Sequence, residues 1–203
     1  MNRMFTQLAF LIMAMLTVFT ASCSHVVHKV DVLYSPLSKY KGGTGTLDLV
    51  RVDSVSHGST GPSIRWVVGQ IKNSEGEATG DIISTIRPQD VVADAFMQEL
   101  ATAGYQVRST KKLDKSSEKG IIFTSMSVQL DEVPSLTRLE SSCSILVKMD
   151  LWKGGTIVKR LEYSSKLSDV AVLDRELLPN SLFQKAIQQI MHQALPDIIQ
   201  NLN

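Results

Sequence analysis

The chain has few of the side chains that bind metal ions or form disulfide bonds. Among its 203 residues are two cysteines and four histidines. His25 and His28 have a spacing that occurs in metal sites, but no further histidine or cysteine follows closely enough to complete one. The composition therefore predicts no metal site and no bound cofactor, and it allows at most one disulfide bond.

An excess of either charge is also missing. The chain has 21 Lys and Arg residues against 20 Asp and Glu residues. Nucleic-acid binding needs clustered basic side chains that neutralise phosphates. The basic cluster at residues 111–115 continues into a polar stretch that is typical of a solvated loop. We therefore expect no nucleic-acid partner.

The sequence lacks the motifs of common enzyme classes. No G-x-S-x-G nucleophile motif is present. The glycine-rich residues 42–45 precede a strand-like stretch, so no helix N-terminus follows them to hold a phosphate. The acidic pairs Asp131-Glu132 and Asp174-x-Glu176 lie in predicted loops, where neighbouring carboxylates are usually solvated. We predict that the protein is not an enzyme.

What the chain does have is an export signal over residues 1–22. Arg3 gives a basic start, and residues 8–19 form an apolar or nearly apolar run. Small residues follow at positions 20–22, as the cleavage zone of such a signal requires. A membrane-spanning helix needs about 17–25 apolar residues, so this run is too short to serve as one.

Residues 20–23, Thr-Ala-Ser-Cys, resemble the lipobox of bacterial lipoproteins. In that motif the cysteine is lipidated and becomes the first residue of the mature protein, so the resemblance implies acylation at Cys23. Two or more acyl chains hold a protein firmly on a membrane. Ser24 stands where the inner-membrane retention signal of these proteins has Asp, which implies the periplasmic face of the outer membrane. The alternative is an ordinary cleaved signal with an incidental Cys23.

The rest of the chain has the length of one domain. We predict a lipidated N-terminus with a first strand and linker over residues 23–45, and a single domain over residues 46–203. Glycines at 42 and 43 mark the end of the linker. If Cys23 is lipidated, Cys143 is left without a disulfide partner, and its strand-like surroundings favour a buried, inert thiol.

The best-marked element is a helix over residues 88–103. Pro88 suits the first helical turn, where its missing N–H costs nothing. Apolar residues recur at steps of three and four, which places them on one face. Gly104 suits the position that ends a helix. This face consists of Val92, Ala95, Phe96, Leu100 and Ala103.

An antiparallel meander and a second helix follow. The predicted strands are 120–130, 138–152 and 156–165, and Gly154-Gly155 supplies the tight turn between the last two. The second helix begins at Asn180 or Ser181, which can cap it, and Pro196 is expected to kink or end it near His192. Its apolar face consists of Phe183, Ile187, Ile190, Ala194 and Ile198.

This order predicts an α+β fold. Strands lie before the first helix over 46–52 and 64–71, with a loop over 73–80. Two amphipathic helices need a sheet face to bury against. We expect a single, mostly antiparallel sheet with both helices packed on one face, and with the other face exposed or bound to a partner.

Four residues are candidates for a partner surface. Trp66 and Trp152 lie on or at the end of predicted strands, where they either fill the core or contact a protein or glycan partner. Lys148 and Lys159 belong to neighbouring strands of the meander. We predict that they lie on the polar sheet face away from the helices.

Short motifs cover most of the mature chain after Cys23. They are residues 30–36 (VDVLYSP), 68–76 (VGQIKNSEG), 82–85 (IIST), 91–96 (VVADAF) and the Leu100-x-x-x-Gly104-Tyr105 pattern. Together they resemble the YajG-type family of outer-membrane lipoproteins. The resemblance implies a location and a fold but no reaction, because that family is largely uncharacterised.

Two functions are compatible with the sequence. The first is a non-enzymatic lipoprotein that faces the periplasm and acts as a binding or envelope-assembly module, with acyl chains in the membrane and a protein partner. The alternative is an accessory lipoprotein of an envelope transport system of the ABC type that moves lipid, a possibility suggested by fold analogy.

Overall fold

A computed structural model describes residues 26–30, 34–37, 39–51, 65–114 and 116–203. The predicted signal, Cys23 and residues 52–64 lie outside these residues. The elements in chain order are β1 (Val26–Lys29), β2 (Thr46–Val50), β3 (Trp66–Lys72), β4 (Ala78–Ser84), α2 (Pro88–Ala103), β5 (Gln106–Thr110), β6 (Lys119–Pro134), β7 (Leu139–Lys153), β8 (Thr156–Ala171), the 3₁₀ turn η1 (Arg175–Leu177) and α3 (Leu178–Leu202).

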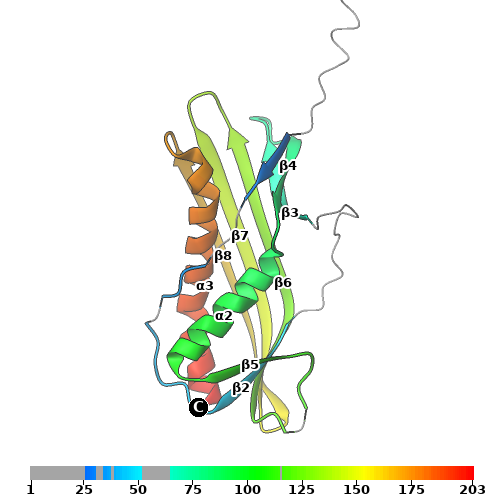
Figure 1. The fold of residues 1–203 in the computed structure, drawn as a ribbon, viewed down its shortest axis with the longest axis vertical. Helices are drawn as coiled ribbons and strands as arrows, with labels where there is room; N and C mark the ends of the chain where they lie inside the picture. Colours follow the sequence, from blue (N-terminus) through cyan, green and yellow to red (C-terminus); the bar gives the residue numbers. More distant parts are fainter. Residues whose placement is uncertain (1–25, 31–33, 38, 52–64, 115) are drawn as a thin grey trace, which may run out of the picture.

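All eight described strands belong to one mixed sheet (Figure 1). The long strand β6 is its centre. One edge of β6 pairs with β7, and the other edge pairs in parallel with β2 near its start and with β3 near its end. The predicted meander of β6, β7 and β8 is confirmed, because both of its pairings are antiparallel.

The prediction of a mostly antiparallel sheet is wrong. Four of the seven strand pairings are parallel, namely β1 with β4, β2 with β5, β2 with β6, and β3 with β6. The reason lies in the chain path, since β2 and β3 follow one another along the same edge of β6. Side chains alternate with a period of two in both kinds of strand, so the local sequence pattern does not distinguish them.

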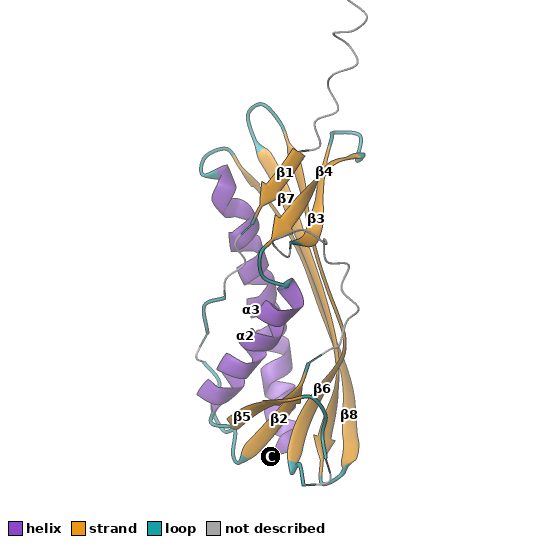
Figure 2. Ribbon diagram, turned by 45° about the vertical axis from the view of Figure 1, so that its right-hand side comes forward, coloured by secondary structure: helices purple, strands orange, loops and turns teal. Residues whose placement is uncertain are grey.

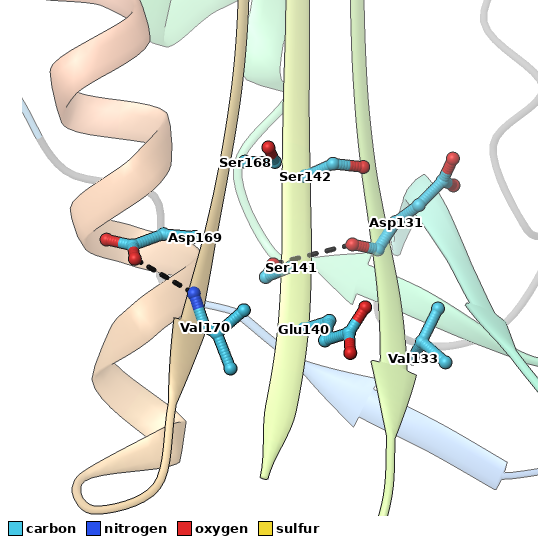
Figure 3. A pocket seen from close by; sticks show the side chains of 8 residues that line it. All are labelled: Asp131, Val133, Glu140, Ser141, Ser142, Ser168, Asp169 and Val170. Carbon is cyan, nitrogen blue, oxygen red and sulfur yellow. Dashed lines mark hydrogen bonds between the residues drawn. The ribbon is translucent and has the colours of Figure 1, made fainter. Parts of the chain in front are cut away.

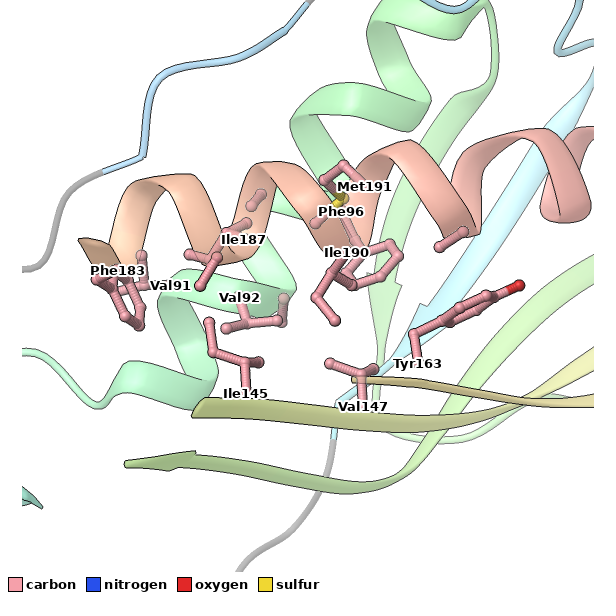
Figure 4. Close-up of a cluster of buried hydrophobic side chains, with 14 of the residues drawn as sticks. Val91, Val92, Phe96, Ile145, Val147, Tyr163, Phe183, Ile187, Ile190 and Met191 are labelled. Atoms are coloured by element: carbon pink, nitrogen blue, oxygen red, sulfur yellow. The ribbon is translucent and has the colours of Figure 1, made fainter. Parts of the chain in front are cut away.

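Both helices lie on one face of the sheet, as predicted (Figure 2). The five apolar-face residues predicted for each helix are all buried, and all except Ala103 belong to one continuous core. Figure 4 shows Ile187 and Ile190 of α3 directed towards Ile145 and Val147 of β7. Burying such a side chain stabilises the fold by about 1.5–3 kcal/mol, so this layer is the main source of stability.

The boundaries of α2 agree with the sequence prediction. The helix has Pro88 in its first turn and ends at Gly104, whose φ of 120° is open to glycine. The hairpin turn is also confirmed, because Gly154 and Gly155 have φ angles of 58° and 86°. These are the positive values that a two-residue turn between strands requires.

Helix α3 departs from the prediction at both ends. It begins at Leu178 and continues through Pro196 to Leu202. Proline has no N–H to donate to the carbonyl four residues earlier, which belongs to His192. The hydroxyl of Tyr40 lies 3.3 Å from that carbonyl oxygen and donates to it. A partner from outside the helix therefore satisfies the group that Pro196 leaves free.

The strand β4 occupies part of the predicted loop at 73–80. The turn itself covers only Asn73 to Glu77, where the Asn73 side-chain oxygen accepts hydrogen bonds from the N–H groups of Glu75 and Glu77. Gly80 lies in β4 beside Val26, and a Cβ at Gly80 would come within 2.1 Å of the Val26 carbonyl oxygen. The glycine in this strand thus permits the close approach of β1.

Candidate functional site

Two hollows lie at the same end of the sheet. The first, of about 370 Å³, is bounded by β1, the end of β6, the start of β7 and η1. Its walls are largely apolar side chains with a few charged groups among them. They consist of Val26, Val27, His28, Ile71, Glu132, Pro134, Leu139, Arg175 and Glu176.

Arg175 holds two loops together at this hollow. Its guanidinium donates to the carbonyl oxygens of Ser135 and Leu136 in the β6–β7 turn, at 3.2 Å each. It also donates to the carbonyl oxygen of Val172 at 3.2 Å. Because these bonds use the guanidinium to cap backbone groups, Arg175 acts here as a structural brace.

A buried carboxylate forms the floor of the hollow. Glu132 is 3% exposed, and its Oε2 lies 2.8 Å from Nδ1 of His28 on β1. The partly exposed His28 thus joins β1 to the central strand β6. A protonated Nδ1 gives Glu132 a charge-assisted hydrogen bond, which is stronger than a neutral one.

The second hollow, of about 410 Å³, is lined by the end of β6, the start of β7 and the end of β8 (Figure 3). Most of its lining side chains stand on the sheet face away from the helices. The lining consists of Asp131, Val133, Glu140, Ser141, Ser142, Ser168, Asp169 and Val170. Its serine hydroxyls and carboxylates can exchange hydrogen bonds with a polar ligand or a protein surface.

The carboxylates of this second hollow already have cationic neighbours. Asp131 accepts from Lys72 at 2.7 Å, and Glu140 accepts from Arg138 at 2.7 Å. Such partly exposed pairs each contribute about 0–1 kcal/mol to stability, so they are easily rearranged by a partner. The hollow is therefore suited to polar recognition.

The two predicted tryptophans lie far apart along the sheet. Trp66 is half-buried against the core, and the Arg87 guanidinium lies 5.9 Å from its ring centre. Trp152 pairs with Gly120, near the start of β6, and its buried indole N–H has no hydrogen-bond partner among the described residues. By contrast, β3, which begins at Trp66, pairs with the end of β6.

The predicted lysine pair does not share one sheet face. Lys148 faces Glu162 across the β7–β8 ladder, with 2.9 Å between Nζ and Oε2, on the face away from the helices. Lys159 is in register with Leu151, whose side chain is buried on the helix side. Residues opposite one another in a ladder point to the same face, so the placement of Lys159 beside Lys148 is corrected.

Cys143 is a buried free thiol in β7. Burial raises the pKa of the Cys143 thiol to about 12, so at neutral pH it remains protonated. The thiolate is the reactive form of cysteine, and Cys143 is therefore inert in the folded protein. Among the described residues, no group of three or more His, Cys, Asp or Glu side chains could hold a metal ion.

Within the part of the chain that the structure describes, no helix combines the length and the apolar character needed to cross a bilayer. The apolar face of the amphipathic helix α3 packs against the sheet that it covers.

Comparisons with known proteins give only distant similarities in structure. No protein-family model and no curated protein sequence matches the chain. A Xanthomonas campestris protein of the DUF330 family aligns at 8% identity over 87% of this chain and 96% of its own, with a TM-score of 0.48. A neuraminyllactose-binding hemagglutinin homologue from Helicobacter pylori aligns at 11% identity over 85% and 96%, with a TM-score of 0.42.

A third solved structure is the rare lipoprotein B from Shewanella oneidensis. It aligns at 10% identity over 65% of this chain and 96% of its own, with a TM-score of 0.34. These similarities concern the arrangement of helices and strands. Membership in the YajG-type family stays a prediction from the sequence motifs.

Proposed function

We propose that the chain is a lipoprotein anchored at Cys23 to the periplasmic face of the outer membrane, where it acts as a non-enzymatic binding or assembly module. The observation that supports this most directly is the lipobox at residues 20–23, which follows the apolar run at 8–19. The first described strand, β1, begins at Val26, three residues after Cys23.

The short separation between Cys23 and β1 limits how far the domain can lie from the membrane. Each residue of an extended chain spans at most about 3.3–3.6 Å, so three residues reach roughly 11 Å. The domain is then held beside the membrane and meets partners that are themselves confined there. Confinement of this kind raises the effective concentration of two binding partners without any new contact.

The proposed partner surface is the sheet face away from the helices. It includes the hollow around Ser142 and Ser168 and the exposed ion pair between Lys148 and Glu162. Mixed charges of this sort favour a specific, reversible protein contact, because they set orientation and association rate more than raw affinity. Beside this face, β8 pairs with β7 alone among the described strands, and its other edge could also bind a strand.

The anchor is tested by replacing Cys23. The Cys23→Ala variant should leave the membrane fraction, and its N-terminal peptide should lose the acyl mass in a mass spectrum. Ser22→Ala is the matched control, because it keeps a small residue in the lipobox and should leave both properties unchanged. A Cys23→Ala variant that stays in the outer-membrane fraction would contradict the anchor.

The partner surface is tested with two lysines of one hairpin. Crosslinking and pull-down in detergent extracts should recover less partner with Lys148→Ala than with the unsubstituted protein. Lys159→Ala removes the same charge on the other side of the sheet and should leave recovery unchanged. Equal recovery with both variants would move the partner to another surface.

An accessory role in lipid transport is the second candidate. The apolar hollow beside β1 favours it, because Val26, Ile71 and Leu139 could line the path of an acyl chain. Purification in mild detergent followed by lipid analysis tests this role. Stoichiometric lipid or co-purified permease subunits would favour transport, and a lipid-free protein without such subunits would favour the first function.

A further inference from the structure

Exposed apolar side chains gather at one end of the molecule. Seven of the eleven large hydrophobic residues that are exposed among the described residues lie there, in three separate segments. We call this set the apolar tip. It consists of Val26 and Val27 of β1, Leu136 of the β6–β7 turn, and Val170, Val172, Leu173 and Leu177 around the β8–α3 connection.

The three exposed segments also lie close together in the folded protein. Arg175 binds the carbonyl oxygens of Leu136 and Val172, so it joins the two loops. The first hollow has Val26 and Val27 on one side and Arg175 on another, which brings β1 to the same place. Figure 1 shows the start of β1, the β6–β7 turn and the β8–α3 connection at the end opposite the C-terminus.

The degree of exposure is greatest at the outermost positions. Leu136 is fully exposed and Leu173 is 81% exposed. Single apolar residues on a surface are common, but a group drawn from several segments is typical of a contact with another molecule or a membrane. The acidic residues Asp174 and Glu176 lie among them, so positive charge is not what would bring the tip to another surface.

The chain itself indicates what covers this tip. Val26 belongs to the tip and is three residues from Cys23, a separation of at most roughly 11 Å along an extended backbone. Acyl chains on Cys23 would lie in the bilayer. A bilayer that holds them is therefore within reach of the tip, and no comparable constraint brings a protein partner to it.

We propose that the apolar tip lies in the surface of the phospholipid leaflet that holds the acyl chains of Cys23. This inference rests on the proposed lipid anchor. Leu136 and Leu173 enter the boundary between headgroups and acyl chains, as the apolar faces of interfacial helices do. The long axis then stands away from the membrane, and the β7–β8 hairpin at the opposite end points into the periplasm (Figure 2).

The test uses the full-length, acylated protein in vesicles of phosphatidylethanolamine and phosphatidylglycerol. Leu136→Cys and Leu173→Cys are each labelled with an environment-sensitive NBD fluorophore. Cys143 does not compete for the label, because its buried thiol stays protonated. Ile157→Cys is the matched control, since Ile157 is also an exposed apolar residue but lies beside the hairpin at the other end.

The label at positions 136 and 173 should be blue-shifted and quenched several-fold more strongly by doxyl-labelled lipid than the label at 157. Thermal unfolding of each labelled variant checks that it is folded, and Val172→Cys reports on the same loop if Leu173→Cys does not fold.

Other outcomes overturn the proposal in distinguishable ways. Equal quenching at 136 and 157 in protein bound to vesicles would contradict the tip and leave the anchor standing. Loss of the protein from the vesicles would contradict both. A label at 136 that is in water in vesicles but shielded in intact cells would assign the tip to a protein partner.

Discussion

The two ends of the molecule differ in how their side chains are paired and buried. At the end that holds the C-terminus, Asn203 joins neighbouring segments of the chain by hydrogen bonds. Its side-chain oxygen accepts from the hydroxyls of Tyr105 at 3.1 Å and Thr44 at 3.3 Å, and its amide donates to the Gly42 carbonyl oxygen. Its backbone oxygen accepts from Lys153 at 2.9 Å. We call this region the closed end.

At the closed end, a charged side chain and an aromatic ring also contact each other inside the fold. Lys119 is buried, donates to the Thr44 carbonyl oxygen at 2.8 Å, and lies 5.6 Å from the centre of the Tyr105 ring. At the apolar tip, by contrast, Leu136 and Leu173 are left in water. The closed end uses its polar and aromatic side chains within the fold, and the exposed side chains of the tip are the basis of our proposal that it contacts the membrane.

The largest effect is expected at the closed end. Tyr105→Ala should lower the free energy of unfolding by about 3 kcal/mol or more, because it removes a buried ring and leaves a cavity. Burial raises the pKa of Tyr105, so its hydroxyl stays protonated and donates to Asn203. Tyr105→Phe should cost only about 1 kcal/mol, which is the hydrogen bond alone. Urea unfolding measures both, and equal losses would contradict the cavity argument.

The link between β1 and the sheet should show the next largest effect. His28→Ala leaves the buried Glu132 without its nearest partner, at a cost of about 2 kcal/mol. The control is Arg138→Ala, which breaks an exposed pair with Glu140 at the same end and should cost less than about 1 kcal/mol. Chemical denaturation compares the two variants. A smaller loss for His28→Ala than for Arg138→Ala would show that the buried pair does not tie β1 in place.

A smaller effect is expected where Tyr40 compensates for Pro196. Tyr40→Phe removes the hydroxyl beside His192 and should cost about 1 kcal/mol. In a Pro196→Ala background the helix regains its own donor to the His192 carbonyl, so the same substitution should cost less. A double-mutant cycle measures this coupling. Additive losses would mean that the hydroxyl does not stand in for the missing N–H.

The smallest effect on stability is expected at the apolar tip. Leu136→Ser should change the free energy of unfolding by no more than about 0.5 kcal/mol, as is usual for exposed positions. Thermal unfolding of the detergent-solubilised protein measures it. A loss comparable to that of Tyr105→Ala would assign Leu136 to the fold and would remove the contrast between the two ends.

Sequence patterns were sufficient where a local residue type decides the structure. Pro88 and Gly104 fix the two ends of α2, and Gly154-Gly155 fix the β7–β8 turn. The apolar faces of both helices follow from a spacing of three and four residues, and the structure buries every residue so predicted. These features depend on neighbours in the chain.

Features that depend on distant residues could not be predicted in this way. The first half of strand β4 contains Ala78, Gly80 and Asp81, which are weak strand formers, and the strand is held by β1 on one side and β3 on the other. The continuation of α3 past Pro196 depends on Tyr40, more than 150 residues earlier in the chain.

The candidate site likewise has features that depend on chain neighbours and features that depend on distant residues. The lipobox-like sequence at residues 20–23 is a local pattern and could be found by inspection, although Cys23 lies outside the described residues. The apolar tip could not, because Leu136 and Leu173 lie in separate loops that are far apart in the sequence. Only the meeting of the β6–β7 turn with the β8–α3 connection makes them one surface. The misplacement of Lys159 has a similar cause, since a register shift between Leu151 and Trp152 changes the alignment of β8.

Hydrogen exchange on the acylated protein in phospholipid vesicles tests the contrast between the ends most directly. With the soluble Cys23→Ala variant as reference, amides of residues 135–138 and 172–177 should exchange more slowly in the vesicle-bound protein. Amides of the hairpin at residues 153–156 should exchange at the same rate in both. Unchanged exchange at the tip, or equal slowing at both ends, would contradict a membrane-facing tip on a lipid-anchored domain.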